Sequence, residues 1–436
     1  MSKNNNFLNR AKIRIPGLTQ LLSKRPDQFA PGTWPTYFSK ALGTHVWDLD
    51  GNKYLDMSIS GIGANVLGYC DADVDQAVIA TIQNGNSSSL NCPEEVELAE
   101  LLCEVHPWAE KVRFARTGGE SMAIAVRIAR AATDKDKIIF CGYHGWHDWY
   151  LAANLSSEAS LEGHLLPGLS PSGVPKGLKG TSIPFEYNNI EQLRNIFEKN
   201  TGEIAAVVME PMRSIEPNPG FLQGVRNITK KVGAVLVFDE ISSGFRLNTG
   251  GLHLIHNVIP DIAVFGKAMS NGYPMGAIIG KEDIMEACQN TFISSTYWSE
   301  RIGPTAALAT IRKFDRNNVS SHLIDVGKNI QSIWQEAAEK NNLEITVSGM
   351  YPISHFSFEN DENLEKMTFY IQEMLDAEIL ASNHFYANYC HKDEHVEHYQ
   401  TATENIFSKI KQLSERDAIL NKISGQLMRP GFHRFN

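Results

Sequence analysis

The sequence predicts an α/β protein with a mostly parallel sheet, followed by a smaller α+β lobe. Short apolar runs recur from Val112 onward, and helical patterns such as residues 119–133 and 221–233 separate the earlier runs. Buried strands that alternate with helices are typical of a parallel sheet covered on both faces. The runs are "VRFAR" (112–116), "KIIFCGY" (137–143), "AAVVMEP" (205–211), "AVLVFDE" (234–240), "IAVFGKA" (262–268) and "GAIIG" (276–280).

The segments around these runs predict a hairpin, two helices and a long loop. Residues 44–57 ("THVWDLDGNKYLDM") alternate apolar positions around an Asp-Gly pair, which is a hairpin signal. Apolar spacing of three and four predicts helices over 71–85 and 93–107, the second with a proline in its first turn. Residues 155–185 are rich in Ser, Gly and Pro. They are predicted to form a long loop, a kind of segment that is often functional.

A change of pattern near residue 312 predicts a domain boundary. A helical pattern over 326–342 is followed by the strand-like pieces "LEITVSG" and "ISHFSFE". We therefore expect three parts. They are an N-terminal segment (1–70), a large domain (71–311) and a C-terminal small α+β domain (312–436).

Composition and charge argue against several classes of function. The net charge of −10 argues against a nucleic-acid-binding protein, which would carry a basic face. It also gives no reason to expect attraction to an anionic membrane. No apolar run reaches the roughly 18 residues of a membrane helix, and the N-terminus lacks the apolar core of a signal peptide. Six scattered cysteines without a CxxC pair favour free thiols in a reducing compartment. We expect a cytoplasmic protein that binds neither nucleic acid nor membrane.

Ligands of open α/β sheets bind beyond the carboxyl ends of the strands, so the residues after each run are candidates. Gly118 and Gly119 follow the first run and precede a helix, where exposed amides suit a phosphate. A plain strand-to-helix turn fits these glycines equally well. The second run leads into "YHGWHDWY" (143–150), whose rings suit a stacked planar ligand. Its histidines, His144 and His147, suggest a metal site, but they lack a third ligand at a recognised spacing.

Acidic residues and one lysine follow the later runs. A carboxylate at the end of an apolar strand is costly without a partner, so Glu210 and Asp239 are expected to face one site. Lys267 follows "IAVFG" and is either a surface lysine or a desolvated amine that attacks carbonyls. An acidic partner for a ring nitrogen, together with a lysine Schiff base, is the arrangement that holds pyridoxal phosphate (PLP). The order of these groups along the strand ends is a stronger signal than any one of them.

These motifs make the chain resemble the PLP-dependent aminotransferases of fold type I, class III, and most of all the branch with glutamate-1-semialdehyde aminomutase. The likeness covers nearly the whole chain. It runs through "VWDLDGNKYLDM", "VRFARTGGESMAIAVRIAR", "YHGWHD", "VVMEP", "GAVLVFDEISSGFR", "FGKAMSNGYPMGAIIG" and "SSTYW". The resemblance implies a large domain with a mostly parallel seven-stranded sheet and a smaller α+β domain built from both termini. It also implies a homodimer with sites at the subunit interface.

The resemblance assigns roles to the matching residues. Lys267 would form the Schiff base and move the proton, Asp239 would bind the pyridinium nitrogen, and Glu210 would lie near the cofactor's O3′ and the substrate. The cofactor-binding set is completed by Gly118 and Gly119 at the phosphate, Tyr143 and Ile241 on the two ring faces, His144, and Thr296, which would reach the neighbouring subunit's phosphate. The loop over 155–185 would correspond to the family's gating loop.

The departures from the aminomutase pattern all lie on the substrate side. The family's N-terminal "NSPVR" run is not recognisable in "RIPGLTQLLSKRP", and the segment after the Glu-Pro dipeptide is shorter. Tyr386, in "FYANY", stands where the aminomutases carry a substrate-side glutamate. Since the cofactor side is intact, we expect the same cofactor with a different substrate. This ranks transamination above the mutase reaction.

The expected reaction moves an amino group from an amino donor, glutamate in the first place, to a small keto or aldehyde acceptor. Sugars and related polar carbonyls are included because the pocket side offers aromatic and polar side chains, namely Tyr37, Tyr297, Trp298, His384 and Tyr386. Arg213 either grips a substrate carboxylate or phosphate or pairs with Glu216 at the surface. Two alternatives stay open. One is a glutamate-1-semialdehyde 2,1-aminomutase of tetrapyrrole synthesis, and the other is a cofactor-binding protein without catalysis.

Overall fold

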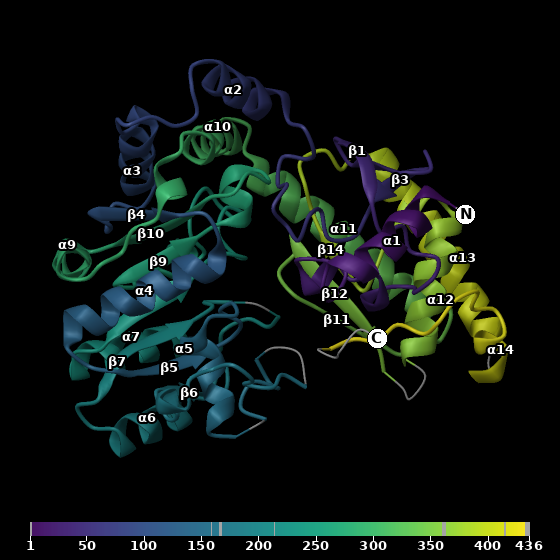
Figure 1. The fold of residues 1–436 in the computed structure, drawn as a ribbon. Helices are drawn as coiled ribbons and strands as arrows, with labels where there is room; N and C mark the ends of the chain where they lie inside the picture. Colours follow the sequence, from purple (N-terminus) through teal and green to yellow (C-terminus); the bar gives the residue numbers. More distant parts are fainter. Residues whose placement is uncertain are drawn as a thin grey trace. The chain divides into compact units, whose positions relative to one another are not determined.

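The computed structural model describes residues 2–157, 159–164, 168–212, 214–359, 363–413 and 416–431. The chain forms two compact units, of which one is residues 72–320 and the other combines residues 1–71 with 321–436. Figure 1 shows the elements of both units along the chain.

A seven-stranded sheet forms the middle of the 72–320 unit, with the strand order β4-β10-β9-β8-β7-β5-β6. β10 runs antiparallel to both of its neighbours, and the pairs from β9 to β6 are parallel. The predicted seven-stranded, mostly parallel sheet is therefore confirmed. The strands are β4 (Lys111–Ala115), β5 (Lys137–Cys141), β6 (Ser182–Pro184), β7 (Ile204–Met209), β8 (Val235–Asp239), β9 (Ile262–Phe265) and β10 (Gly276–Gly280).

Helices surround this sheet and include the two that the apolar spacing predicts, α2 and α3, with Pro93 at the start of the second. The α-helices are α2 (Ala72–Gln83), α3 (Pro93–Val105), α4 (Gly118–Thr133), α5 (Asp148–Leu151), α6 (Ile190–Lys199), α7 (Phe221–Val232), α8 (His253–His256), α9 (Glu282–Met285) and α10 (Ile302–Arg316). Short 3₁₀ helices are η3 (Ala152–Leu155), η4 (Lys176–Leu178), η5 (Lys267–Ser270), η6 (Glu286–Asn290) and η7 (Thr296–Ser299).

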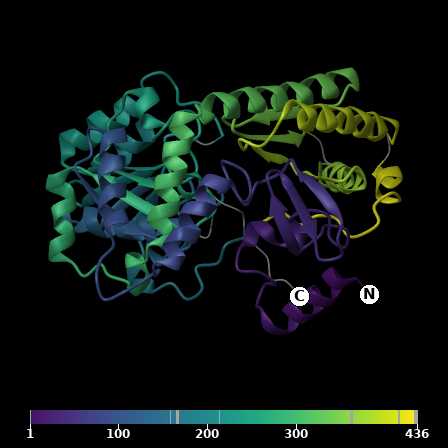
Figure 2. The same cartoon turned by 90° about the horizontal axis from the view of Figure 1, so that it is seen from above.

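Both faces of the sheet are apolar, which explains the continuous apolar runs of its strands. Ile138 and Phe140 of β5 belong to one core cluster together with Ile124 of α4. Ile139, between them, belongs to a second cluster together with Phe221 of α7. Consecutive side chains of a strand point to opposite faces, so a sheet with two apolar faces needs two helical layers. Figure 2 shows helices on both sides of the strands.

The segment predicted as a loop over 155–185 contains a strand that its composition hid. β6 pairs with β5 and lies at the edge of the sheet. Pro184 cannot donate a backbone hydrogen bond, and a short edge strand tolerates this because one of its sides has no partner strand. The described residues between η3 and β6 otherwise form turns and the short helix η4.

The parallel strands place their carboxyl ends at one edge of the sheet. β10 begins at this edge, because Gly276 pairs with Ala115 at the end of β4. The segments that leave the other strands there carry most of the predicted site residues, namely Gly118, Gly119, Tyr143, His144, Glu210, Asp239, Ile241 and Lys267. The fold therefore brings together residues that are up to about 150 positions apart in sequence.

The second unit contains two small sheets, with the orders β1-β2-β3-β13 and β11-β12-β14. The predicted hairpin is present, since β2 and β3 are antiparallel on either side of the Asp-Gly pair. Among the described residues, no helix is long and apolar enough to cross a membrane. The elements are α1 (Lys3–Arg14), η1 (Leu22–Lys24), η2 (Pro26–Gln28), β1 (Phe38–Leu42), β2 (His45–Asp48), β3 (Lys53–Asp56), α11 (Val319–Lys340), β11 (Ile345–Ser348), β12 (Ile353–Phe358), α12 (Asn363–Asp376), β13 (Ile379–Leu380), β14 (His384–Tyr386), α13 (Asp393–Gln412) and α14 (Arg416–Leu420), with α11 beginning just before the boundary between the units.

Candidate active site

Asp239 is the last residue of β8, and its carboxylate is buried against His144. Asp239 Oδ2 lies 2.8 Å from His144 Nδ1, and Oδ1 accepts the Ile241 N–H at 3.1 Å. His144 Nε2 lies 3.1 Å from the carbonyl oxygen of Cys141, so both ring nitrogens face acceptors. This geometry favours a doubly protonated imidazole, which balances the negative charge of Asp239.

Glu210 and Tyr143 meet where β7 and β5 end. The Tyr143 N–H donates to Glu210 Oε2 at 3.1 Å. Gly142 makes this contact possible, because its φ is 109° and a Cβ on it would lie 2.5 Å from the same oxygen. Tyr143 itself is 38% exposed, so part of its side chain is accessible to a ligand.

Helix α4 presents its N-terminus at the same edge of the sheet. Thr117 caps the helix in a reciprocal capping box with Glu120. The first-turn amides of Gly118 and Gly119 have no intrahelical acceptor and lie at the positive end of the helix dipole. A Cβ on Gly118 would lie 3.0 Å from Ile241 Cδ1, so the loop after β8 packs closely on this turn.

Lys267 follows β9 after one glycine, Gly266, and begins η5 with a φ of 45°. A left-handed backbone at a residue other than glycine is uncommon, and such strain gathers at functional sites. Lys267 Nζ donates to Ser242 Oγ at 2.7 Å. A Cβ on the preceding Gly266 would lie 3.5 Å from Ile241 Cγ2. The lysine, the loop after β8 and the start of α4 therefore converge around Ile241.

Sequence reasoning missed the network around Glu240, which is fully buried. The Glu240 carboxylate accepts from Ser243 Oγ at 2.5 Å, Leu252 N at 2.9 Å, His253 N at 2.9 Å and His253 Nδ1 at 2.8 Å. Burial alone raises the pKa of Glu240, but these hydrogen bonds outweigh burial and lower the pKa. His253 Nε2 in turn accepts from Trp108 Nε1 at 2.9 Å. The network fixes the loop that contains Ser242.

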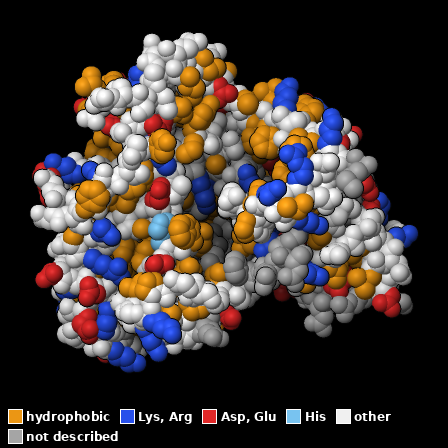
Figure 3. Space-filling model, in the orientation of Figure 1, with side chains coloured by type: hydrophobic (Ala, Val, Ile, Leu, Met, Phe, Trp, Pro, Cys, Tyr) orange, Lys and Arg blue, Asp and Glu red, His pale blue; other side chains and the backbone are white. Residues whose placement is uncertain are grey.

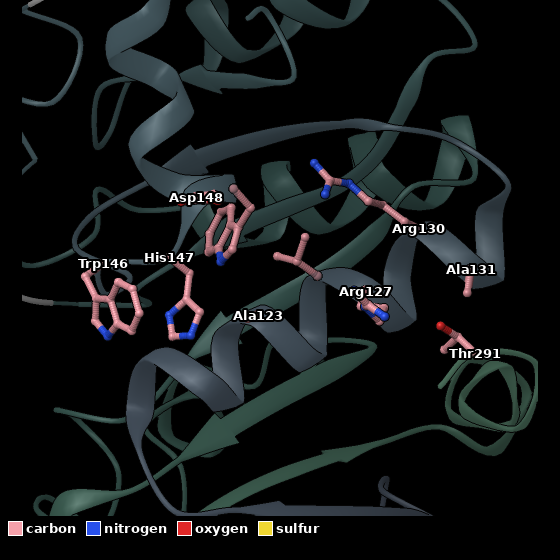
Figure 4. A pocket seen from close by; sticks show the side chains of 10 residues that line it. Ala123, Arg127, Arg130, Ala131, Trp146, His147, Asp148 and Thr291 are labelled. Atoms are coloured by element: carbon pink, nitrogen blue, oxygen red, sulfur yellow. The ribbon is translucent and has the colours of Figure 1, made fainter. Parts of the chain in front are cut away.

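The second histidine of the aromatic segment lies apart from Asp239. The rings of Trp146 and His147 stack with centroids 4.3 Å apart and line a separate hollow of about 630 Å³. Figure 4 shows this hollow beside the α4 side chains Arg127 and Arg130. Burial lowers the pKa of His147. Within the described ranges, no three His, Cys, Asp or Glu side chains are grouped to hold a metal ion.

Thr296 and Trp298 lie in the segment before α10. Thr296 is exposed in η7, whereas Trp298 packs partly buried against the core. Arg116, directly after β4, donates to the carbonyl oxygens of Trp298 at 2.9 Å and Glu300 at 3.0 Å. It also forms an ion pair with the Glu300 carboxylate at 2.8 Å. The sheet edge thus holds the backbone of this segment.

Of the other two predicted substrate residues, one is outside the described residues and one belongs to the second unit. Arg213 lies outside the described residues. Tyr386 is on β14 of the other unit, where its N–H donates to the carbonyl oxygen of Ser58 at 2.7 Å. The substrate roles of Arg213, Tyr386 and Trp298 stay predictions.

The groups at the sheet edge fit a phosphorylated pyridine aldehyde. Asp239 offers a buried carboxylate to a ring nitrogen, and the amides at the start of α4 suit a phosphate. The Lys267 amine can attack an aldehyde. A Cβ on Gly118 would lie 3.0 Å from Ile241 Cδ1, so the glycine avoids a crowded contact at this turn. This donor set matches the chemistry of PLP.

Comparison with known proteins decides the family. The model of the family "Aminotransferase class-III" matches residues 29–399. The chain belongs to the class-III aminotransferases. It is therefore an enzyme of the aminotransferase family, and its cofactor is pyridoxal 5′-phosphate.

The relatives of this class-III aminotransferase carry the names of both reactions considered above. It is 30% identical over 426 residues to the 3-aminobutyryl-CoA aminotransferase of Cloacimonas acidaminovorans, covering 95% of this chain and 98% of the relative. It is 33% identical over 361 residues to a glutamate-1-semialdehyde 2,1-aminomutase of Lachnoclostridium phytofermentans, covering 80% and 83%. The FumI protein of Sphingopyxis sp. MTA144, solved in its PLP internal aldimine form, has a TM-score of 0.86 at 22% identity over 97% of this chain and 98% of that one. This likeness shows the fold, which is that of the fold type I PLP-dependent transferases.

Proposed function

We propose that the enzyme moves an amino group from an amino donor, glutamate in the first place, to a small keto or aldehyde acceptor. One observation carries the proposal most directly. The amine of Lys267, the Asp239–His144 pair and the start of α4 converge at one edge of the sheet. Transamination needs such a set, because the amine must leave one molecule, stay bound and pass to a second.

Each converging residue has a part in this proposal. When bound, PLP supplies an aldehyde that takes up amines and a ring that delocalises the charge left when a carbon loses a proton. Lys267 would attach the cofactor, and its amine, once freed, would take a proton from the substrate carbon and return it. Asp239 would keep the ring nitrogen protonated, and His144 would keep Asp239 anionic and in position. Tyr143 and Ile241 would pack on the ring faces, and Glu210 would bind near O3′.

The length of the matches supports an intermolecular reaction over the aminomutase. The relative that matches over 95% of this chain is named an aminotransferase, whereas two relatives named aminomutases match over 80% and 87% of it. The aminomutase remains the second candidate, because one of these two relatives is 33% identical. The acceptor class is proposed on the substrate-side differences in sequence, and it includes sugars and other polar carbonyls.

A donor and acceptor screen tests the proposal. The PLP-loaded protein is mixed with glutamate, or with 3-aminobutyryl-CoA in a parallel arm, and the long-wavelength absorption of bound PLP is followed. We expect this absorption to fall, with release of an equal amount of 2-oxoglutarate in the glutamate arm or of 3-oxobutyryl-CoA in the parallel arm. Adding a keto acid, an aldehyde or a keto sugar should restore it. Loss of absorption with no donor at all contradicts the intermolecular scheme.

Two controls separate the alternatives. Glutamate-1-semialdehyde that turns into 5-aminolevulinate without an added donor identifies the aminomutase. Bound PLP that responds to no amine identifies binding without catalysis. Lys267→Ala should lose all turnover while the protein keeps its fold, as measured by circular dichroism. Turnover retained in this variant contradicts the assignment of the lysine.

Arg213 is proposed to bind a substrate carboxylate or phosphate. Arg213→Ala is then expected to raise the KM for the amino donor more than it lowers kcat, because a uniform binding contact is lost. Arg194→Ala is a matched control, since Arg194 is an exposed arginine paired with Glu191. Unchanged donor kinetics in Arg213→Ala contradict the role and favour a surface pair with Glu216.

We also propose a cytoplasmic homodimer in which Thr296 reaches the partner's phosphate site. Phe292 and Tyr297, which flank this residue, are 85% and 75% exposed, so a second copy would bury apolar surface there. Hydrophobic side chains, orange in Figure 3, also reach the surface around α2 and α3. The six free thiols agree with a reducing compartment.

Mixed dimers test the shared site. Chains with Lys267→Ala and chains with Thr296→Ala are combined, and PLP affinity is measured at the one intact lysine. If Thr296 serves the partner's site, that lysine lies in a wholly wild-type site and binds PLP as tightly as the wild type. If Thr296 serves its own subunit, the affinity equals that of the Thr296→Ala homodimer. Light scattering that gives one 48.6 kDa chain contradicts the dimer itself.

A further inference from the structure

Ser242 makes a contact with the reactive amine that the sequence did not single out. Its Oγ accepts a hydrogen bond from Lys267 Nζ at 2.7 Å. The two residues come from different strand ends, since Ser242 lies in the loop after β8 and Lys267 follows β9. The distance is at the short end of the normal range for such a bond. The contact therefore belongs to the tertiary arrangement of the site and not to local backbone geometry.

The backbone of Ser242 is held by bonds on both sides. Its carbonyl oxygen accepts from Nε of the fully buried Arg246 at 2.9 Å. On the other side, the Ile241 N–H donates to Asp239 Oδ1 at 3.1 Å. Gly244 N donates to the carbonyl oxygen of Glu240 at 2.8 Å, which closes the turn around the serine. The hydroxyl is thus presented to the lysine by a preorganised loop.

A hydroxyl suits a lysine that changes its protonation state. The oxygen of a serine can accept an N–H from an ammonium group, and its O–H can rotate to donate to a neutral amine. Neither an alkyl side chain nor a carboxylate has both abilities. A carboxylate would hold the ammonium more tightly and oppose its return of the proton.

We propose that Ser242 is a further catalytic residue, which holds the freed Lys267 amine in place while that amine takes and returns the substrate proton. The proposal deepens the proposed function and rests on it. The neutral amine uses its lone pair to take the proton from the substrate carbon, and one N–H of the resulting ammonium donates to Ser242 Oγ. The ammonium then returns the proton to carbon, and Ser242 itself neither gains nor loses a proton.

The first test uses the full chain without cofactor. Competitive labelling with acetic anhydride over a range of pH, read by mass spectrometry of the Lys267 peptide, gives the pH at which Nζ becomes reactive. Ser242→Ala should move this midpoint down by roughly one pH unit, because the charge-assisted bond that Ser242 accepts from the ammonium is stronger than the bond that it can donate to the neutral amine. Ser242→Thr keeps the hydroxyl and should restore the wild-type midpoint.

Ser243→Ala is the matched control, because its hydroxyl bonds to Glu240 and not to the lysine. This variant should lower the melting temperature without moving the labelling midpoint. A midpoint that moves equally in both alanine variants reports a general loosening of the loop and overturns the proposal. A midpoint that stays put in Ser242→Ala overturns it as well.

The second test uses the PLP-loaded enzyme. Ser242→Ala should lower kcat roughly 10-fold, with the donor KM changed less than about two-fold, since the lost bond acts on the proton transfer and not on binding. The isotope effect from a donor deuterated at the reacting carbon should rise. Ser242→Thr should recover most of kcat. Equal kcat and isotope effect in wild type and Ser242→Ala contradict the role.

The two tests also separate this inference from the proposed function. If no donor reacts with the wild type, the proposed function fails. The labelling midpoint measured without cofactor still tests the contact between Ser242 and Lys267. If donors react normally in Ser242→Ala, only the role of Ser242 is lost.

Discussion

Two carboxylate–histidine pairs lie side by side at the end of β8, and they differ in almost everything but composition. Asp239 contacts His144 at 2.8 Å, and the next residue, Glu240, contacts His253 at the same distance. Consecutive side chains at a strand end point to opposite sides. One pair therefore reaches the edge where the cofactor groups converge, and the other reaches the interior beneath the following loop.

The difference lies in how much hydrogen-bonding capacity each pair has left. Glu240 accepts four bonds, which is about all that a carboxylate can take. Its partner His253 receives a donated N–H at Nε2 from Trp108, so this imidazole is neutral. Asp239 accepts two bonds, and its partner His144 faces two acceptors. A saturated pair supports structure, whereas an unsaturated one is ready for a ligand.

Removing the charge of Asp239 is expected to have the largest effect. Asp239→Asn should lower kcat/KM roughly 10³-fold, because an amide neither keeps a ring nitrogen protonated nor balances the charge of His144. Steady-state kinetics on the PLP-loaded variant measure this, and urea unfolding should change little by comparison. A variant that unfolds easily but retains full kcat per folded molecule would show that Asp239 supports stability and not catalysis.

The matching change at the neighbouring residue should affect stability instead. Glu240→Gln removes a buried charge from the imidazole and three other donors, and should lower the free energy of unfolding by about 4 kcal/mol. Urea unfolding followed by tryptophan fluorescence measures the loss. The labelling midpoint of Lys267 serves as a second readout, since the loop with Ser242 depends on this carboxylate. An unfolding curve that matches the wild type would contradict the saturated network.

The sequence revealed Asp239 and concealed both carboxylate–histidine contacts for physical reasons. Asp239 and Lys267 were predictable because a charge at the end of a fully apolar strand demands a partner, and their order along the chain is specific. Glu240 carries the same signal one residue later, but its partner His253 lies 13 positions away, at the start of the four-residue helix α8. Ser242 was equally hidden, because nothing in "ISSGF" distinguishes it from Ser243. His144 suggested a metal or a stacked ring, while its burial against a carboxylate appears only in three dimensions.

His106 extends the saturated network and predicts how stability depends on pH. Burial is the main cause that lowers the pKa of His106, to about 4, with a smaller contribution from the nearby His253. Glu240 and the carbonyl oxygen of Leu102 act in the opposite direction. Between pH 6.5 and 4, His106 thus binds a proton in the unfolded chain but not in the folded chain. Stability should fall by about 3 kcal/mol as pH decreases through this window, and be fully present above it.

Two variants isolate this pH dependence. His106→Gln should remove the part of the slope that arises in the 72–320 unit, as measured by urea unfolding at pH 7 and pH 4.5. His391, in the other unit, has its pKa lowered by burial to about 3 and should keep its own contribution. His391→Gln is therefore the matched control, and the two losses of slope should add in the double variant. A slope unchanged in His106→Gln contradicts a neutral buried imidazole at this position.

The smallest expected effect tests the far end of the Glu240 network. Trp108→Phe removes the N–H that donates to His253 Nε2 at 2.9 Å and should lower the free energy of unfolding by about 1 kcal/mol beyond the loss of ring volume. Trp149→Phe is the matched control, because the buried Nε1 of Trp149 has no hydrogen-bond partner among the described residues. The difference in the free energy of unfolding between the two variants, measured with urea at pH 8, gives the contribution of the hydrogen bond to stability. Equal losses in both variants would show that the Trp108 bond contributes nothing to the Glu240 network, and the contrast with His144 would then rest on Glu240 alone.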